Sequence, residues 1–484
     1  MKVSIGIDLG TSSMKFTVVS IDGTVLENVS RPIELLLPHD GFAEENLSDF
    51  RDALFSGLGT LAERDYEIEA IAIDGQMHGL CLLDSASEPL YPCILWNDSR
   101  SKDICFRLNQ NKGFLLSRTG DIAFPGFTLP KLLWIKENER DVFSSISHIL
   151  LPKDYLNFLL TGEFVTDPSD ISGSLFYNIF LNEYDKDILS MVGLDEKVYP
   201  RIVPSKSYIT TVLDSVKNRL GLKGACKVYQ GAGDNMAASY SVYRVDDTAC
   251  NISLGTSGTI YAQSEKPNYP DNGSIHLFQS IDGGFCSLSC MLSCCSSLNW
   301  FLNRILGTKD YDGEIGSIST ETILSNRCFF LPYLMGERSP INDPDARGLF
   351  YPLSLDTTRA DMVLSVIEGI CFALRDSFEV LKSMGYRIEK ATLTGGGAKS
   401  KWFKLILSSV LGIQLVHPLE EKGPSYGMAL VGLVSSGLLD EKKKNELLSS
   451  NLECVSPDPS LVLHYERRYQ EFRKLYPLIS KFRD

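Results

Sequence analysis

Residues that could bind phosphate lie near the N-terminus, where Asp8 ends an apolar, β-branched segment. A short turn with Thr11, Ser12 and Ser13 follows, and Lys15 comes shortly after it. Such a turn points backbone N–H groups and hydroxyls outward and can hold the β- and γ-phosphates of a nucleotide. Asp8 would hold Mg²⁺ through water, because Mg²⁺ keeps much of its hydration shell. Taken alone, an ordinary hairpin explains the same residues.

A repeat favours the phosphate interpretation. The sequence Leu-Gly-Thr-Ser of Leu9–Ser12 recurs at Leu254–Ser257, again after an apolar segment, and offers Gly255 and Thr256 as a second turn. The pattern of Tyr66–Gly75 also recurs, at Tyr386–Gly395. Two related halves, each beginning strand–turn–strand, predict a nucleotide held between two similar domains.

A carboxylate in the first half is placed to act on an alcohol. Asp234 follows Gly231-Ala232-Gly233 at a predicted strand end and precedes a predicted helix at 235–244. The N-terminus of that helix would keep the carboxylate ionised, so that it can accept a proton. A plain helix N-cap is the alternative.

A run of glycines, Gly395–Gly397, marks a turn in the second half. It follows a predicted strand at Ala391–Thr394 and precedes a predicted helix from Trp402. Glycines there let the backbone approach a phosphate or an adenine closely, although a tight strand–helix turn needs the same residues.

Two further segments mix polar and aromatic side chains. Met77 and His78 lie between glycines after a strand, so His78 is expected to be more exposed than a core histidine and to bind rather than catalyse. Trp96–Arg100 combines an indole, a carboxylate and a guanidinium. That combination suits sugar hydroxyls, and it suits a surface turn with an ion pair equally well.

The surrounding pattern predicts mixed α/β structure that can position these residues. Strands are expected at Val3–Leu9, Lys15–Ile21, Thr24–Ser30 and Ile68–Ile73. Helices are expected at 47–61, 131–138, 152–160, 362–384, 402–411 and 465–482. A chain of 484 residues forms at least two domains, and we place the boundary at 244/245, within a short connection at 240–250.

Composition excludes several partners. The net charge of −14 argues against a nucleic-acid surface or an anionic membrane surface. With neither a long apolar segment nor a signal peptide, the sequence predicts a cytoplasmic protein with no membrane partner. The cysteines include a cluster, Cys286–Cys295, whose last three members could share a helix face and bind a soft metal; buried thiols in a reducing compartment are the preferred interpretation.

Longer motifs resemble those of the FGGY family of carbohydrate kinases, over nearly the whole chain. Ile5–Ser12 is similar to the phosphate-binding start of the family, and Gly126–Trp134 to its first signature. The motifs Gln76–Gly79, Leu95–Asp98, Leu151–Leu156, Leu331–Tyr333 and Gly336–Arg338 resemble those of the members that act on D-xylulose. In the second signature, Gly348–Leu353, Pro352 stands where glycine is usual, which bears on a loop near the nucleotide side.

The resemblance implies two actin-like (ribonuclease H-like) ATPase domains with a cleft between them, residues 1–244 for the sugar and catalysis and 245–484 for the nucleotide. It implies ATP-dependent phosphorylation of D-xylulose to D-xylulose 5-phosphate with Mg²⁺. Asp234 matches the catalytic base, and Asp8 the aspartate that activity and Mg²⁺ placement require. The implied sugar residues are Met77, His78, Trp96, Asp234 and Asn235, and the implied nucleotide residues are Thr11, Ser12, Ser13, Lys15, Gly255, Thr256, Gly396, Gly397 and Lys401.

Other functions stay open at this point. Ribulose, gluconate or glycerol would suit a related kinase, and a homodimer is compatible with the sequence. A non-kinase ATPase of the same fold would leave Asp234 and the Met77–His78 loop without a use, and a sugar-binding protein without catalysis is disfavoured by the presence of both Asp8 and Asp234.

Overall fold

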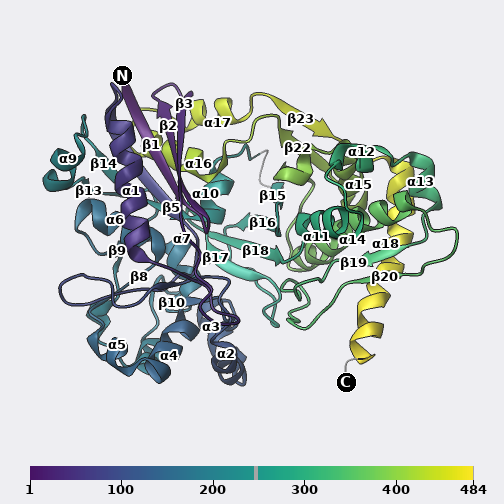
Figure 1. The fold of residues 1–484 in the computed structure, drawn as a ribbon, viewed down its shortest axis with the longest axis horizontal. Helices are drawn as coiled ribbons and strands as arrows, with labels where there is room; N and C mark the ends of the chain where they lie inside the picture. The colour runs from purple at the N-terminus through teal and green to yellow at the C-terminus, as the bar shows by residue number, and fades with distance from the viewer. Residues whose placement is uncertain (245–248, 483–484) are drawn as a thin grey trace.

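The computed structural model describes residues 1–244 and 249–482, which form two large β-sheets placed side by side with helices packed around them (Figure 1). The first sheet has the strand order β13-β14-β5-β1-β2-β3. Its antiparallel meander is β1 (Lys2–Leu9), β2 (Ser13–Ser20) and β3 (Val25–Pro32). Strands β5 (Glu67–Gly75) and β14 (Lys227–Gly233) run parallel to β1, and β13 (Tyr208–Thr211) forms the edge.

The second sheet repeats this plan, with the order β17-β18-β16-β15-β21-β22-β23. Strands β15 (Ala249–Leu254), β16 (Gly258–Ser264) and β18 (Phe285–Met291) are its meander. Strands β21 (Lys390–Thr394) and β22 (Gln414–Pro418) follow in parallel, and β17 (His276–Gln279) and β23 (Leu452–Val455) are the edges. Strand β17 comes between β16 and β18 in the chain and has no counterpart in the first sheet. Apart from it, the two halves share one strand order, as the sequence repeat predicts.

The second repeated pattern, Tyr66–Gly75 and Tyr386–Gly395, also occupies equivalent positions in the two sheets. Leu9 pairs with Gly75 at the end of β5, and Ser253 pairs with Thr394, which places Gly395 beside Leu254. Gly395 has a φ of +94°, and a Cβ there would lie 2.6 Å from the backbone of Leu254. Glycine is required at this turn by its conformation and by the close strand behind it.

The helices around the sheets agree with the predicted positions, apart from one that ends early. Helix α10 (Asp234–Tyr240) stops at Tyr240 rather than at 244. Helices α1 (Leu47–Ala62) and α6 (Pro152–Thr161) contact the first sheet, and α14 (Arg359–Ser383), α15 (Lys401–Leu411) and α18 (Pro459–Ile479) pack together in the second half (Figure 1). The remaining helices are α2 (Lys102–Asn109), α3 (Lys112–Thr119), α4 (Thr128–Asn138), α5 (Arg140–Ser145), α7 (Pro168–Ile171), α8 (Lys186–Val192), α9 (Asp214–Leu220), α11 (Cys295–Trp300), α12 (Tyr311–Gly316), α13 (Thr320–Ser325), α16 (Gly423–Ser435) and α17 (Glu441–Leu448).

Short strands complete the two halves. They are β4 (Glu44–Glu45), β6 (Cys81–Leu83), β7 (Cys93–Ile94), β8 (His148–Leu150), β9 (Val165–Thr166), β10 (Tyr177–Asn178), β11 (Glu183–Tyr184), β12 (Arg201–Ile202), β19 (Phe329–Leu331) and β20 (Leu349–Tyr351).

Helix α16 comes from the second half of the chain and packs on the first sheet, against β1, β2, β5 and β14. The contact is close because Gly6 has no side chain: a Cβ there would lie 1.7 Å from the carbonyl oxygen of Ser425. Thr17 and Ser425 share a hydrogen bond of 2.8 Å, and Tyr426 donates to the Gly23 carbonyl. The sequence reasoning did not foresee this crossing, since it assigned all of 245–484 to one domain.

The predicted domain boundary stays a prediction. Helix α10 ends at Tyr240 and β15 begins at Ala249, so the change of sheet falls inside the expected connection. Residues 245–248, directly after the predicted boundary, lie outside the described residues.

Candidate active site

Three aspartates meet where three neighbouring parallel strands end. Asp8 pairs with Asp74 across β1 and β5, Ala232 of β14 pairs with Asp74, and Asp234 follows two residues later. Asp74 is fully buried, and neither of its carboxylate oxygens has a hydrogen-bond partner among the described residues. Burial, followed by the charges of Asp8 and Asp234, raises its pKa well above the ordinary value.

The pKa of Asp234 departs from the sequence-based expectation. The helix N-terminus was expected to keep this carboxylate ionised, which corresponds to a low pKa. Instead, burial and the nearby charge of Asp8 raise the pKa of Asp234 to about 7. Two hydrogen bonds oppose that shift: the backbone N–H and the Nδ2 of Asn235 donate to Asp234 Oδ1 at 2.7 and 2.9 Å. A pKa close to neutrality suits a general base.

Asp8 lies in a similar environment. Burial raises its pKa, and the Lys15 ammonium, 4.0 Å from Asp8 Oδ2, opposes that rise. Three carboxyl groups meet one ammonium here, and burial raises the pKa of all three. A bound cation would favour their ionised forms, and the oxygens of Asp74 without partners would be further acceptors. The donor set therefore fits a hydrated divalent cation. Across residues 1–244 and 249–482, no three His, Cys, Asp or Glu side chains are placed to ligate one metal ion directly.

One cavity gathers the predicted sugar residues. Met77, His78, Trp96, Asp234 and Asn235 all line a cavity with a volume of about 270 Å³. Gly255 of the second repeated turn lies on its wall as well, so the cavity is bounded by both halves of the chain. The second half adds polar and aromatic lining residues: Asn251, Ser253, Ser257, Thr259, Tyr261, His276, Phe278 and Arg338.

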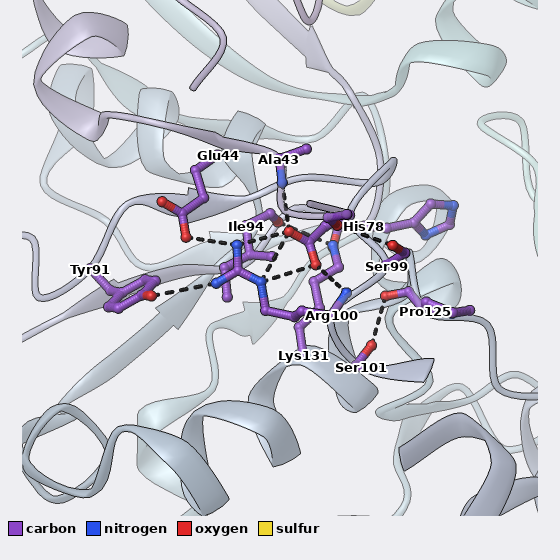
Figure 2. Close-up of polar contacts among 12 residues, drawn as sticks. Ala43, Glu44, His78, Tyr91, Ile94, Ser99, Arg100, Ser101, Pro125 and Lys131 are labelled. Atoms are coloured by element: carbon purple, nitrogen blue, oxygen red, sulfur yellow. Dashed lines mark hydrogen bonds and ion pairs between the residues drawn. The ribbon is translucent and has the colours of Figure 1, made fainter. Parts of the chain in front are cut away.

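His78 is held rigidly at the cavity wall. It is 8% exposed, so the expectation of an exposed histidine is wrong. Its φ is +70°, in the left-handed region, and its carbonyl accepts from Thr128 Oγ1 at 2.9 Å. The same carbonyl accepts from Lys131 Nζ at 2.8 Å (Figure 2). Its Nδ1 lies 2.7 Å from the Gly173 carbonyl, which can only accept, so Nδ1 carries the proton. The Nε2 of this histidine is then a free acceptor, because burial keeps the pKa of His78 well below its usual range.

These contacts explain the first signature segment. Thr128 and Lys131 belong to Gly126–Trp134 and begin α4. Both are fully buried, and Lys131 also donates to the Ile94 carbonyl at 3.1 Å. Burial lowers the pKa of Lys131 to about 7. The signature residues thus fix the backbone of His78.

The first repeated turn is linked to the cavity through Trp96. Trp96 Nε1 donates to Thr11 Oγ1, and Thr11 Oγ1 donates to Gln76 Oε1, both at 3.1 Å. Gln76 in turn donates to Glu45, whose pKa burial raises to about 8. Thr11 is therefore joined to the cavity wall through Trp96, whereas Gly255 lies on that wall itself.

The remaining predicted nucleotide residues are more exposed to solvent. Ser12, Lys15 and Thr256 are exposed, and Ser13 is half-buried. Past β21, Gly396 and Lys401 are exposed, and a Cβ on Gly396 would have open space around it. Gly397 packs against Leu254 and the sulfur of Cys295, which gives this glycine a packing role. The structure brings these residues to the ends of β1, β15 and β21 without enclosing them in the cavity described above.

Two alternatives left open by the sequence are not borne out, one at Arg100 and one in the cysteine cluster. Trp96 of the same segment as Arg100 does line the cavity, and Cys286 and Cys294 are buried, as the preferred interpretation of the cluster expects. The guanidinium of Arg100 is fully buried, where it pairs with Asp98 at 2.8 Å and Glu44 at 2.6 Å; it is neither a sugar ligand nor a surface ion pair (Figure 2). The cysteine cluster does not share a helix face: Cys286 and Cys290 lie in β18, whereas Cys294 and Cys295 begin α11.

Sequence reasoning also missed some residues of this site. Asp74 ends a strand next to Asp8, and its register with Asp8 was the available signal. Gln76 belongs to a quoted motif, but its bond to Thr11 depends on a contact between two loops. His276 lies in a short edge strand beside Leu277 and Phe278 and gave no signal.

Comparison with known proteins agrees with this geometry. Residues 3–240 match the N-terminal domain of the FGGY family of carbohydrate kinases, and residues 250–436 match its C-terminal domain. The chain therefore belongs to the FGGY family of carbohydrate kinases. It is a sugar kinase, a phosphotransferase with ATP as its phosphate donor, on a two-domain actin-like fold.

Particular relatives are similar over nearly the full length. The chain is 32% identical to the xylulose kinase of Escherichia coli strain K12 over 478 residues, which cover 98% of each chain. A ligand-bound xylulose kinase from Lactobacillus acidophilus has a TM-score of 0.94 at 25% identity, with 99% of both chains covered. A gluconate kinase from the same organism has a TM-score of 0.92 at 24% identity, covering 99% of this chain and 98% of its own, and shows the shared fold alone.

The part of the chain that the structure describes contains no helix long and apolar enough to cross a membrane.

Proposed function

We propose that this protein transfers the γ-phosphoryl group of ATP to D-xylulose and forms D-xylulose 5-phosphate. The observation that carries the proposal is the cavity in which Met77, His78, Trp96, Asn235 and Asp234 come together. It combines neutral acceptors and an indole, which suit a polyhydroxylated sugar, with one carboxylate whose pKa is near 7. The xylulose kinases to which the chain is similar support this choice of sugar.

Asp234 is the general base in this proposal. Its carboxylate accepts the proton of the primary hydroxyl as the sugar oxygen attacks the γ-phosphorus. The bond between that phosphorus and the β–γ bridging oxygen breaks, and ADP leaves with the electron pair. Asn235 orients Asp234 through its two hydrogen bonds, so the accepting oxygen has a fixed position.

The two repeated turns hold the phosphates in this proposal. Thr11, Ser12, Ser13 and Lys15 contribute from the first half, and Gly255 and Thr256 from the second. Their hydroxyls and backbone N–H groups supply donors to the transferring group. Gly396, Gly397 and Lys401 form the adenosine side.

The divalent cation is Mg²⁺ in this proposal, held through water by Asp8 with Asp74 beside it, and when bound it supplies positive charge that offsets the charge of the phosphates. In the same proposal, residues 1–244 carry the sugar side and the base, and residues 245–484 carry most of the nucleotide side. Helix α16 ties the two parts together through its contact with β1.

A coupled assay of ADP release tests the proposal. D-xylulose, D-ribulose, D-gluconate and glycerol are each supplied with ATP and Mg²⁺, and the product is examined by phosphorus NMR. We expect the highest kcat/KM with D-xylulose and a phosphate on its C5 oxygen. A higher kcat/KM with D-gluconate, whose kinase shares this fold, would assign the enzyme to another sugar.

A further inference from the structure

A second histidine on the cavity wall has no role in the proposed reaction. His276 lies in β17, on the second half of the chain, and is 2% exposed. Its Nδ1 is 2.9 Å from Asp121 Oδ1 and 3.1 Å from Asp121 Oδ2. Asp121 comes from the first half, so this pair joins the two halves directly beside the cavity.

The bond to Asp121 determines which nitrogen is available. An ionised carboxylate can only accept, so Nδ1 of His276 carries a proton that it donates to Asp121. The opposite edge of the ring carries Nε2, and this atom is buried without a hydrogen-bond partner among the described residues. His276 lines the cavity whereas Asp121 does not, and Nε2 is the ring nitrogen turned away from Asp121. Leaving a buried polar atom without a partner is unfavourable, and a ligand that pairs with it removes that cost.

The surroundings of His276 hold its ring in place. The ring stacks on Phe278 with centroids 5.7 Å apart and packs against Phe127 at 5.4 Å. The same two phenylalanines contact the ring of His78, at 5.8 Å and 4.4 Å. Two histidines, one from each half, thus pack around one aromatic cluster. The Nδ1 of each is hydrogen-bonded, to the Gly173 carbonyl for His78 and to Asp121 for His276.

We propose that His276 Nε2 binds a hydroxyl of the sugar and selects for the sugar that carries it, with Asp121 as the residue that positions the ring. This inference rests on the proposed sugar kinase site. The hydroxyl is not the one that reacts, because the reacting hydroxyl lies against Asp234 and gives its proton to that carboxylate. Since His276 belongs to the second half, the bound sugar contacts both halves at once, and a sugar without the matching hydroxyl leaves Nε2 unpaired.

Two substitutions separate sugar binding from a structural role. In His276→Asn, the short amide can keep the bond to Asp121 but has no group at the Nε2 position. In His276→Gln, the longer amide reaches that position. We expect His276→Asn to raise KM for the sugar about 10- to 100-fold, with kcat within a few-fold of wild type and a melting temperature close to it. His276→Gln should recover part of the lost affinity.

The control is His148→Asn, because His148 is a half-buried histidine that stacks on Phe164 outside the cavity. It should leave KM unchanged. A wild-type KM in His276→Asn would overturn the proposal, since the bond to Asp121 alone would then explain the residue. Each variant is assayed with the best sugar of the wild-type enzyme, so a preference for a sugar other than D-xylulose would correct the proposed function without deciding the role of His276.

A second test varies the sugar and begins with the wild-type protein. Pentuloses that lack one hydroxyl, at C1, C3 or C4, are compared with the parent sugar. We expect one of them to lose at least tenfold in kcat/KM with wild type and to show no further loss with His276→Asn, because the two changes remove the same contact. Equal kcat/KM for every deoxy sugar would contradict the inference.

Discussion

Lys131 offers a test of how His78 is held, because its buried amine should make the free energy of unfolding depend on pH. Lys131 is fully buried in α4, and burial lowers the pKa of its ammonium from 10.5 to about 7. Between these two values the unfolded chain binds a proton that the folded protein does not bind. The free energy of unfolding should therefore rise with pH in this window, by about 1.4 kcal/mol per pH unit for one proton. Over the window from about pH 7 to 10.5 the gain is roughly 5 kcal/mol.

Lys131→Met keeps the shape of the side chain and removes the proton. We expect the difference in stability between Lys131→Met and wild type to depend on pH: the variant gains relative to wild type near pH 7 and loses that advantage towards pH 10. The assay is chemical denaturation at pH 7, 8, 9 and 10. The variant should also raise KM for the sugar, because the carbonyl of His78 keeps only the bond from Thr128.

Lys136→Met is the matched control. Lys136 lies in the same helix and also donates to two backbone carbonyls, those of Met191 and Val192, but it is half-buried. Its substitution removes two comparable hydrogen bonds from a half-buried position and so gives the baseline for the difference seen with Lys131→Met. A pH-independent difference for Lys131→Met would show that the amine is not desolvated as the structure indicates.

Further predictions concern the carboxylates and the helix contact. The kcat/KM for the sugar should fall about tenfold per pH unit below about pH 7 and level off above it, because Asp234 must be ionised to accept a proton. A pH profile of kcat/KM that is flat down to pH 5 would contradict this. Asp8→Asn should raise the Mg²⁺ concentration needed for half-maximal activity, measured by Mg²⁺ titration; an unchanged titration with normal turnover would reduce Asp8 to a strand-end residue. Gly6→Ala should lower the melting temperature or abolish soluble expression, because its Cβ would overlap the Ser425 carbonyl. The control Gly113→Ala has open space in α3 and should be neutral or stabilising. Equal melting temperatures for the two variants would refute the close contact of α16.

Much of the fold could be predicted, because local apolar patterns indicate its strands and helices and a sequence repeat relates its two sheets. The meander at Val3–Leu9 and the helix at 47–61 follow from apolar spacing, and the two Leu-Gly-Thr-Ser turns identify the shared topology of the sheets. The position of α16 could not be predicted in this way. Its apolar residues indicate only that it is buried, and the partner strand is revealed by Gly6, more than four hundred residues earlier in the chain.

The candidate site was predicted where residues follow strands in sequence and missed where loops meet in space. Met77, His78 and Asp234 lie after strands and come together as expected. The exposure of His78 was misjudged because its burial comes from α4 and Gly173, which are distant in sequence. The pKa of Asp234 was expected to be low because only the effect of the helix N-terminus was considered, whereas burial and the charge of Asp8 raise it.

The central claim is that Asp234 removes the proton from the sugar hydroxyl, and Asp234→Asn tests it most directly. The amide keeps the shape of the side chain but cannot accept the proton. In single-turnover experiments with saturating ATP, Mg²⁺ and D-xylulose, we expect phosphoryl transfer to slow by about 100- to 10,000-fold while ATP affinity stays near that of wild type. Phosphoryl transfer at the wild-type rate in Asp234→Asn would contradict the assignment of Asp234 as the base.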